Sequence, residues 1–405
     1  MEKRASTRVY YLDWLRVLAI LMVFVYHTTR FFNMEDWFIK NPTWYPWVQV
    51  WNRFAVAWMM PLIFVISGAS LFYAVGKSGA GKFVKDKVLR LLVPFLVCVF
   101  THASLQVYLE RLTHGDFRGT YFQFLPHYFQ GIYEGGNPAS GNFAVTGAHL
   151  WYLLYLFVFS IVLYPLMRWF TGRGQRVLSR LDDLLALPGG IYALALPMVL
   201  LLVLFDPSSP VMAEQEAGWS LVIYLWLLFA GFVLFSNERL QASAQRLRWP
   251  SLALAMVSIG MFLYLTFHFG WPSFATPRYA VVFGLRGLGS WCWVLAALGF
   301  GKKHLEFNTP FLRYANEAVL PFYILHQTVL LCVGYFVVQW LIPDVLRWAI
   351  ILLVSFVLIM VLYEFLVRRF DVMRFLFGMK PRPKARVTQP QEATPTSYPG
   401  PLSSA

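Results

Sequence analysis

Residues 10–33 read YYLDWLRVLAILMVFVYHTTRFFN, and this stretch decides how the rest of the chain is interpreted. It is long and apolar enough to cross a bilayer as one helix, which needs about 20 such residues. Asp13, Arg16 and His27 nevertheless lie within it. Hydrocarbon penalises ionisable groups, so those found inside a membrane span usually have a function. We therefore expect residues 10–33 to form a functional helix.

The spacing of these three residues places them on one side of that helix. Arg16 and His27 are eleven residues apart. They are therefore separated by three turns plus about 20° and lie roughly 16 Å apart along the axis. Asp13 precedes Arg16 by three residues and lies near the same line. A snorkelling arginine and a hydrogen-bonded core histidine would give part of this pattern, but a site that crosses the membrane explains the whole polar stripe better.

Composition extends the membrane interpretation to the whole chain. Of its 405 residues, 58% are hydrophobic and only 13% are charged, whereas a soluble domain carries about a quarter charged residues. We therefore predict an all-α, polytopic membrane helix bundle of about ten transmembrane helices. The predicted spans are 10–33, 54–76, 87–108, 149–171, 191–206, 219–236, 250–269, 279–300, 315–341 and 344–368.

The basic residues predict how this bundle lies in the membrane. The formal net charge is +14, and most of the 34 lysines and arginines stand before the first span, after every second span and after the last one. Cytoplasmic loops carry such an excess. We therefore expect both termini in the cytoplasm and a multi-pass protein of the cytoplasmic (inner) membrane. Basic residues in short loops also argue against a nucleic-acid-binding face.

The chain end and the cysteines contribute little chemistry. Residues 1–380 are predicted to form the membrane domain, and 381–405, rich in Pro, Ser and Thr, a disordered cytoplasmic tail. Cys98, Cys292 and Cys332 lie in apolar runs without CxxC spacing, so we expect neither a disulfide framework nor a metal site.

Cations gather at the predicted cytoplasmic end of the bundle. Lys87 and Arg90 are three residues apart and share a helix face. With Lys82, Lys85 and Arg16 they form a basic mouth. Ordinary topology signals would place the same charges there. The alternative is a clamp for a phosphate-bearing cytoplasmic ligand, because Arg and Lys are the usual partners of phosphate.

Imidazole groups gather toward the predicted outer side. A lone histidine in a span is more often a hydrogen-bonded core residue than a catalyst. A neutral imidazole is nevertheless a suitable general base for a sugar hydroxyl, and several on one side favour a site. The groups in question are His27, His102, His149 and His268 toward the outer surface, His326 near mid-membrane, and Arg286 in the outer half of its span.

Two long outer connections, 34–53 and 109–148, are rich in aromatic residues. The first contains Trp37 and Trp47, and the second contains Tyr133 before a polar turn cluster at 135–142. These aromatic residues fit a belt at the membrane interface. The alternative is a stacking surface for a sugar ring over the outer mouth of the bundle, since long loops in a compact bundle are often functional.

Six short elements occur in order along residues 10–380. They are LDWLR with an Arg-x10-His spacing from Arg16 to His27, FVISG at 64–68, KVLRLLVP at 87–94, HLWYL at 149–153, ANEAVLPFYILHQ at 315–327, and LYEFLVRRF and MRFLFGMKP within 362–381. In these elements the chain resembles the acyltransferase-3 family of membrane O-acyltransferases. It is most similar to the glucan biosynthesis protein C branch, which is associated with succinylation of periplasmic glucans.

The resemblance implies an enzyme that moves an acyl group, acetyl or succinyl, from cytoplasmic acyl-CoA to a hydroxyl of an extracytoplasmic glycan. Acyl-CoA would be a co-substrate, and the activated thioester requires no bound cofactor or metal. By the same resemblance, His27 would be the general base, with Arg16 and Asp13 beside it in the catalytic set. Arg16, Lys87 and Arg90 would bind the CoA phosphates.

The resemblance also implies supporting residues. Ser67, His149, Trp151, Arg286 and His326 are expected to bind the acceptor or to support the site. Lys87 stands where the family has arginine, so the charge is kept but the bidentate phosphate geometry is lost.

Two other classes of function remain open. A transporter or flippase for a solute or lipid-linked sugar would use the same polar stripe. The sequence, however, has no internal repeat and no paired broken helices, which are the usual pointers to transporters. A scaffold protein of the membrane would tolerate apolar residues in place of Arg16 and His27. The expected partners are acyl-CoA, a carbohydrate and membrane lipid, and no oligomeric state is predicted.

Overall fold

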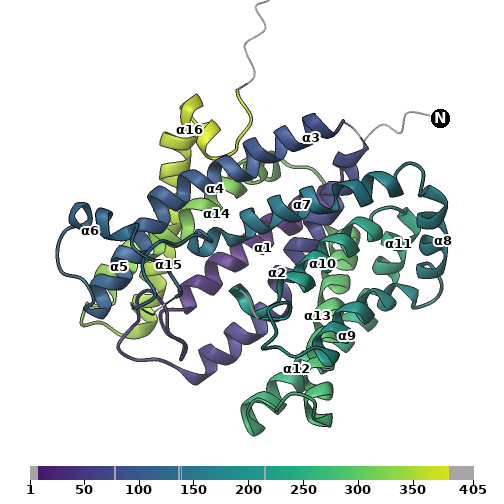
Figure 1. The fold of residues 1–405 in the computed structure, drawn as a ribbon, viewed down its shortest axis with the longest axis horizontal. Helices are drawn as coiled ribbons and strands as arrows, with labels where there is room; N and C mark the ends of the chain where they lie inside the picture. Colours follow the sequence, from purple (N-terminus) through teal and green to yellow (C-terminus); the bar gives the residue numbers. More distant parts are fainter. Residues whose placement is uncertain (1–7, 77–78, 136, 138, 214–215, 383–405) are drawn as a thin grey trace, which may run out of the picture.

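The computed structural model describes residues 8–76, 79–135, 137, 139–213 and 216–382, which fold into helices joined by turns (Figure 1). The all-α prediction is confirmed. Among these residues, eight helical segments are long and apolar enough to cross a membrane. They are α1 (Tyr10–Thr29), α2 (Pro46–Val75), the run from α3 to α5 (Ala80–His114), the run ending in α7 (Ala148–Phe170), α12 (Arg248–Phe269), α13 (Pro277–His304), α14 (Pro310–Val337) and the run beginning with α15 (Asp344–Val367).

Two bent helix pairs correspond to the two remaining predicted spans. α8 (Gln175–Leu185) meets the segment Gly190–Leu204 at 113°, and α10 (Leu221–Leu234) meets α11 (Glu238–Arg246) at 103°. The last nine residues of the former segment are α9 (Leu196–Leu204). Nine residues rise only about 14 Å, roughly half of the hydrocarbon thickness. The part of the chain that the structure describes therefore offers eight unbroken segments able to span a membrane, or ten if each bent pair crosses as one.

The second span begins earlier than predicted. α2 starts at Pro46 rather than at 54, because Tyr45 is extended and the proline ring favours the first helical position. Residues 46–53, predicted as part of an outer connection, therefore form the first two turns of α2. Trp47 and Trp51 accordingly belong to a helix, and the connection after α1 is shorter than expected.

The predicted connection at 109–148 also contains regular structure. α5 (Ser104–His114) extends into it, and α6 (Tyr121–Tyr128) follows, with a capping box at Thr120 and Gln123. Two isolated bridges join Gly131 to Gly141 and Ile132 to Phe143. The predicted outer loop is thus a folded cap, built from a short helix and a segment whose two ends are joined by these bridges.

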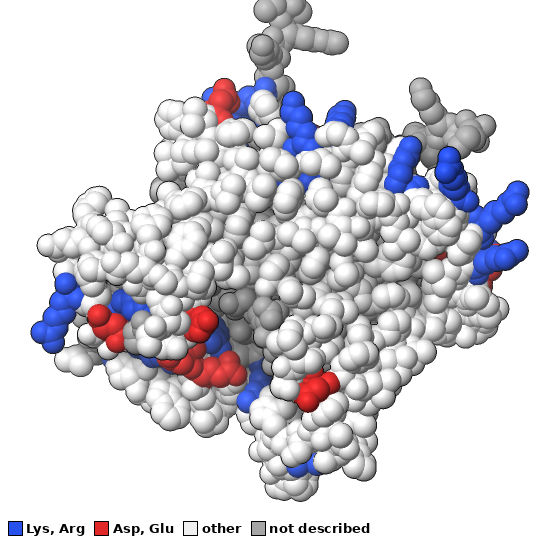
Figure 2. All heavy atoms as spheres, viewed as in Figure 1, with Lys and Arg blue, Asp and Glu red and all other residues white. Residues whose placement is uncertain are grey.

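α1 lies in the middle of the bundle and packs against α2, α13 and α14 (Figure 1). Its two ends give names to the two sides of the molecule, the Arg16 side and the His27 side. Lys and Arg side chains dominate the upper and right edges of Figure 2, near α3 (Ala80–Lys87) and α8 on the Arg16 side. Acidic and basic side chains are mixed around a hollow at the lower left, on the His27 side.

The third span contains two wider, π-helical turns between its α-helical parts. They are Val88–Leu92, which includes Arg90, and Val99–Ala103, which includes His102, and they flank α4 (Val93–Cys98). Single π turns within α-helices often occur at functional sites. The backbone is therefore locally altered at one of the predicted phosphate-binding residues.

The chain end folds back against this altered turn. After α16 (Asp371–Leu376), Gly378 adopts φ +67°, and a Cβ atom there would lie 2.7 Å from the carbonyl oxygen of Arg90. Buried Arg374 forms an ion pair of 2.9 Å with Glu317 of α14. Residues 371–380, here called the C-terminal hook, therefore join α14 to the turn that carries Arg90. The predicted disordered tail lies outside the described residues except for 381 and 382.

α2 and α10 pack with their backbones in contact. A Cβ atom on Gly68 would lie 1.9 Å from the carbonyl oxygen of Leu228, and one on Gly231 would lie 2.1 Å from the carbonyl oxygen of Val65. Small residues allow such close approach between membrane helices, where packing replaces the hydrophobic driving force. This contact fixes the position of α2, which forms one wall of the site described below.

We predict that Gly231→Ala lowers the free energy of unfolding by roughly 1–3 kcal/mol, because α2 and α10 must move apart to admit the methyl group. Thermal unfolding of the purified protein in detergent would measure the effect. Gly284→Ala on α13 is the matched control, since its Cβ would have no neighbour within 4 Å. Equal melting temperatures for the two variants would contradict the close contact.

Candidate active site

A cavity of about 620 Å³ lies on the His27 side of the bundle. Its walls come from α1, α2, α5, α7, α12, α13 and α14 and from the connections after α1, α6, α9 and α12. Aromatic faces and a few polar groups in a concave site are typical of a small-molecule site. The polar and aromatic lining residues include Tyr26, His27, Arg30, Glu35, Asp36, Trp37, Gln49, Asn52, Arg53, Glu110, Tyr133, His149, Trp151, Trp271, Arg286, Tyr323 and Gln327.

The cavity brings together four of the residues predicted from the sequence. His27 comes from the last turn of α1, His149 from the turn Ala148–Leu150, Trp151 from the start of α7, and Arg286 from α13. His326 contacts His27 from α14 without lining the cavity itself. Ser67, Asp13, Arg16, Lys87 and Arg90 do not line it.

Trp37 covers one face of the His27 ring. The two rings are nearly parallel, with an angle of 16° and a centroid distance of 6.1 Å. The Trp37 side chain is buried, because the connection after α1 folds back over the end of the helix. The sequence identified this residue only as one of several candidates for a stacking surface.

His326 supports the His27 ring from behind. The Nε2 atom of His326 lies 3.0 Å from the Nδ1 atom of His27. The Nδ1 atom of His326 lies 2.5 Å from the carbonyl oxygen of Tyr323, one turn earlier in α14. His326 is almost completely buried, so its side of this contact is shielded from water, whereas His27 is half-buried.

His149 is held through both of its ring nitrogens. Its Nε2 atom lies 3.2 Å from the carbonyl oxygen of Tyr323 and 3.1 Å from that of Ile324. Its Nδ1 atom lies 3.2 Å from the Nε2 atom of Gln106. The Tyr323 hydroxyl in turn donates to the carbonyl oxygen of His149. Through these contacts His149, at the start of α7, links α5 to α14.

Gln106 completes a buried polar network that the sequence analysis did not identify. Its amide nitrogen donates to the hydroxyl of Thr328 at 2.7 Å, and its amide oxygen accepts from Gln327 at 3.0 Å. Gln327 also lines the cavity. The signal in the sequence is FYILHQT at 322–328, where Tyr323, His326 and Gln327 are spaced three and four residues apart and share one side of a helix.

Arg286 places a fixed positive charge in the cavity wall. The side chain is buried, donates to the carbonyl oxygen of Gly218, and lies 4.3 Å above the Trp219 ring. A cation over a tryptophan face in a desolvated site is favourable by about 2 kcal/mol. Opposite charges or hydroxyl groups of a ligand are therefore the chemistry that this wall is suited to bind.

Lys40 organises the rim formed by the connection after α1. Its Nζ atom donates to the carbonyl oxygens of Arg30, Asn33 and Glu35 at 2.6–2.9 Å and to the side-chain oxygen of Asn33 at 2.9 Å. Burial, followed by repulsion from Arg30, lowers the pKa of Lys40 to about 8. One ammonium group thus fixes the backbone that carries Glu35, Asp36 and Trp37.

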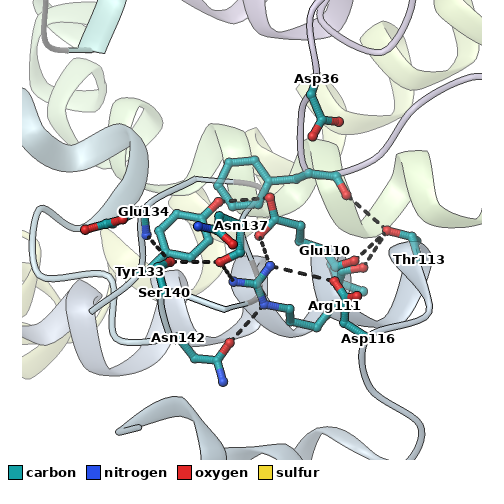
Figure 3. A network of polar contacts seen from close by, with 12 residues as sticks. Asp36, Glu110, Arg111, Thr113, Asp116, Tyr133, Glu134, Asn137, Ser140 and Asn142 are labelled. Atoms are coloured by element: carbon teal, nitrogen blue, oxygen red, sulfur yellow. Dashed lines mark hydrogen bonds and ion pairs between the residues drawn. The ribbon is translucent and has the colours of Figure 1, made fainter. Parts of the chain in front are cut away.

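Arg111 organises the opposite rim (Figure 3). This buried guanidinium donates to Asn142 Oδ1 at 2.9 Å and to the carbonyl oxygens of Gly141 and Asn137 at 3.0 and 3.2 Å. It also lies within 3.6 Å of Glu110. Glu110 accepts a hydrogen bond of 2.9 Å from Tyr133, and both residues line the cavity.

On the Arg16 side, the charges of α1 neutralise one another. Asp13 is buried between Arg8, at 2.6 Å, and Arg16, at 3.1 Å. Arg16 also donates to Ser70 of α2 at 2.9 Å. The amide of Asn316 on α14 joins this cluster: with its nitrogen turned toward Asp13, the orientation that satisfies both amide atoms, it donates to Asp13 at 3.2 Å and accepts from Arg8 at 2.8 Å. Asp13 therefore supports Arg16 and has no contact with the cavity.

The predicted phosphate-binding residues lie at this same end. Arg90 is exposed and close enough to Arg16 for the two charges to repel each other. The ammonium of Lys87 lies 5.3 Å above the Phe83 ring. The structure thus places Arg16 and Arg90 together and leaves the guanidinium of Arg90 accessible.

Ser67 lies on α2, between the two ends. Its hydroxyl is 2.6 Å from the hydroxyl of Tyr152, the residue within HLWYL that the sequence analysis did not select. The ring centroids of Tyr152 and Tyr323 are 5.9 Å apart, and the two rings meet edge to face. One pair of hydroxyl groups therefore lies between the Arg16 side and the histidine cluster.

The remaining predicted histidines lie elsewhere. His268 is exposed at the end of α12 and stacks on Tyr264, and His102 contacts Phe377 of the C-terminal hook. Neither lines the cavity. Among the described residues, no three His, Cys, Asp or Glu side chains come close enough to hold a metal ion.

Comparison with known proteins identifies relatives along almost the whole chain. The acyltransferase-3 family model, described as an acyltransferase domain, matches residues 9–364. The proteins named "Glucans biosynthesis protein C" from Salmonella paratyphi A and Salmonella agona are each 23% identical over 403 residues, covering 94% of this chain and 97% of theirs. The protein of that name from Salmonella heidelberg is 22% identical over the same length. No solved structure matches the chain. The resemblance inferred from the six sequence elements is confirmed.

We predict that Arg111→Leu loosens residues 131–143, because Asn142 and the carbonyl oxygens of Asn137 and Gly141 lose their shared donor. Amide hydrogen exchange measured by mass spectrometry should become at least tenfold faster there, as expected for a loss of about 1.4 kcal/mol or more. Arg118→Leu, at an exposed position in the same cap, is the control. Exchange that matches the control throughout 131–143 would show that Arg111 does not hold this rim.

Proposed function

The chain belongs to the acyltransferase-3 family of multi-pass membrane acyltransferases, and we propose that it transfers an acyl group from acyl-CoA to a hydroxyl of an extracytoplasmic glycan, with His27 as general base. The main observation in support of this proposal is the position of His27. Its ring lines a cavity of about 620 Å³ while His326 supports it from behind. A base oriented by a third group and facing a ligand cavity is the arrangement that general-base catalysis needs.

The Arg16 side is suited to the donor. Arg16, Lys87 and Arg90 place three cations at one end of the bundle, and arginine binds phosphate through charge-assisted, often bidentate hydrogen bonds. We assign this end to the cytoplasm, following the excess of basic residues in the connections there. In a bacterium with this orientation, the protein resides in the inner membrane.

The charged CoA nucleotide remains at that end, so its thioester arm must reach toward His27 over roughly 16 Å of α1. Ser70, which accepts from Arg16, and the Ser67–Tyr152 pair lie along this route, ahead of Tyr323. These hydroxyls offer hydrogen-bond partners to the amide groups of the arm. The close Ser67–Tyr152 contact would have to open for the arm to pass.

The cavity on the His27 side is suited to the acceptor. Trp37, Tyr133, Trp151 and Trp271 present aromatic faces to it, and sugar rings carry apolar faces that pack on such surfaces. Acidic and amide side chains in the same walls can bind hydroxyl groups. The relatives named for glucan biosynthesis favour a glucan as the acceptor.

In the proposed reaction, a sugar hydroxyl attacks the thioester carbonyl as His27 takes its proton. The new ester C–O bond forms, the C–S bond breaks, and CoA leaves as a thiolate that receives the proton. Because a thioester is already activated, the residues here need only orient the two substrates and move one proton. Acetyl and succinyl groups are both candidates, and Arg286 could meet the free carboxylate of a succinyl group.

We predict that His27→Ala lowers acyl transfer by 10²-fold or more, the usual range for loss of a general base, while the protein still inserts into membranes. Transfer of label from radiolabelled acetyl-CoA or succinyl-CoA to envelope glucan would be measured with purified protein. His268→Ala, on the exposed end of α12, is the control. Undiminished transfer by His27→Ala would remove this histidine from the mechanism, and no labelled glucan with the unaltered protein would favour the transporter alternative.

We predict that Arg90→Ala raises the apparent KM for acyl-CoA at least tenfold, consistent with the loss of a charge-assisted contact of about 1.5–3 kcal/mol, with little change in the KM for glucan. Steady-state kinetics with each substrate varied in turn would separate the two effects. Lys303→Ala, exposed at the same end on α13, controls for the general loss of positive charge. Equal increases in both KM values would refute the donor clamp.

A further inference from the structure

We propose that His326 is a positioning residue that fixes the tautomer of His27, holding its Nδ1 atom protonated and leaving the lone pair of its Nε2 atom available to the cavity. The proposal rests on the function proposed above for its catalytic consequence. The hydrogen-bond geometry that carries it is independent of which acyl group or acceptor is used.

The argument begins at the carbonyl oxygen of Tyr323, which can only accept a hydrogen bond. The Nδ1 atom of His326 lies 2.5 Å from it and must therefore carry a proton. A neutral imidazole with a proton on Nδ1 has an acceptor at Nε2. That acceptor lies 3.0 Å from the Nδ1 atom of His27, which must consequently be the donor.

The same logic then fixes the second ring. A neutral His27 that donates from Nδ1 keeps its lone pair on Nε2. Among the described residues, no side chain forms a hydrogen bond with this Nε2 atom, and the backbone of Val23, one turn earlier on α1, is a second polar partner of the ring. His27 is one of the residues that line the cavity. The nitrogen that keeps its lone pair is therefore the one without a side-chain partner, on a residue that lines the cavity.

His149 belongs to the same cluster but has no ring nitrogen available to a ligand. Its Nε2 atom faces the carbonyl oxygens of Tyr323 and Ile324 and must be protonated. Its Nδ1 atom then accepts from the amide of Gln106. Both nitrogens of His149 are occupied, as are both of His326, so His27 alone among these three offers a lone pair to the cavity.

His326 also determines where the proton resides after His27 has accepted it. When the Nε2 atom of His27 takes the hydroxyl proton, its Nδ1–H still donates to His326, which stabilises the imidazolium ion. The proton cannot travel further, because the other nitrogen of His326 is already protonated and faces a carbonyl oxygen. His326 thus orients the base and does not relay its proton, and the proton remains on His27 for delivery to the leaving thiolate.

Two substitutions at one position separate the acceptor role from packing. His326→Gln can donate its amide N–H to Tyr323 and offer its amide oxygen to His27. His326→Leu fills similar space without an acceptor. Both proteins would first be compared by size-exclusion chromatography and thermal unfolding, and folding of the glutamine variant suffices for the test if the leucine variant fails to fold.

The first readout is carbethoxylation by diethyl pyrocarbonate, which attacks an unprotonated imidazole nitrogen, mapped peptide by peptide with mass spectrometry. In the unaltered protein His27 should react faster than His149 and His326. Its rate should fall severalfold in His326→Leu and stay within twofold in His326→Gln, while exposed His268 serves as the internal reference. The proposal would be overturned if His149 or His326 reacted as fast as His27. It would also be overturned if the reaction rate of His27 fell as far in the glutamine variant as in the leucine variant. If the leucine variant does not fold, loss of His27 reactivity in a folded glutamine variant would by itself overturn the proposal.

The second readout is acyl transfer from radiolabelled acetyl-CoA or succinyl-CoA to envelope glucan. His326→Leu should lower kcat about tenfold or more with the KM for acyl-CoA unchanged within twofold, and His326→Gln should recover most of kcat. A rise in KM with unchanged kcat would refute the positioning role. Absence of transfer in every protein would count against the proposed function, whereas the carbethoxylation pattern would still decide the tautomer.

Discussion

The pairing of α1 with α14 supports both ends of the polar stripe. At one end Asn316 of α14 joins the cluster formed by Arg8, Asp13 and Arg16, and at the other His326 contacts His27. Residue numbers increase in the same direction on the two helices, so they run parallel. Because one helix contacts both groups, displacement of α14 relative to α1 would disturb the two ends together.

The constraint behind this arrangement is the cost of burying charge in an apolar bundle. Asp13 lies between two arginines, and Arg286 is held by the carbonyl oxygen of Gly218 and the face of Trp219. His27 is the exception, because one of its nitrogens remains available to a cavity. Asp13 and Arg286, which are held by neighbouring groups, therefore stabilise the fold, whereas His27 is the group most suited to accept a proton from a ligand.

Much of this organisation could be predicted from residue spacing. The stripe on α1 followed from the positions of Arg16 and His27, and the six short elements pointed to the family that the comparisons confirm. Helix breaks were harder to predict, because an apolar run such as 191–206 has the same composition whether it is straight or continues a bent pair. Its true form depends on packing against α13.

The details of the site could not be predicted because they depend on contacts between distant segments. Gln106 meets Thr328 and Gln327 across more than 220 residues of sequence. The folding of Trp37 over His27 depends on Lys40, whose role in a connecting segment has no periodic signal. His326 was selected as a supporting residue, but its contact with His27 required the three-dimensional register of α1 and α14.

The contact between Gly378 and the carbonyl oxygen of Arg90 also has a consequence for biosynthesis. A ribosome makes the third span long before it makes the C-terminal hook, and the hook packs on the third span only after the last membrane helix has been released. Until then the π-helical turn that carries Arg90 lacks one of its neighbours, as does Glu317, which awaits Arg374. The Arg16 side of a nascent chain is therefore completed last, and truncated products of translation would lack its final architecture.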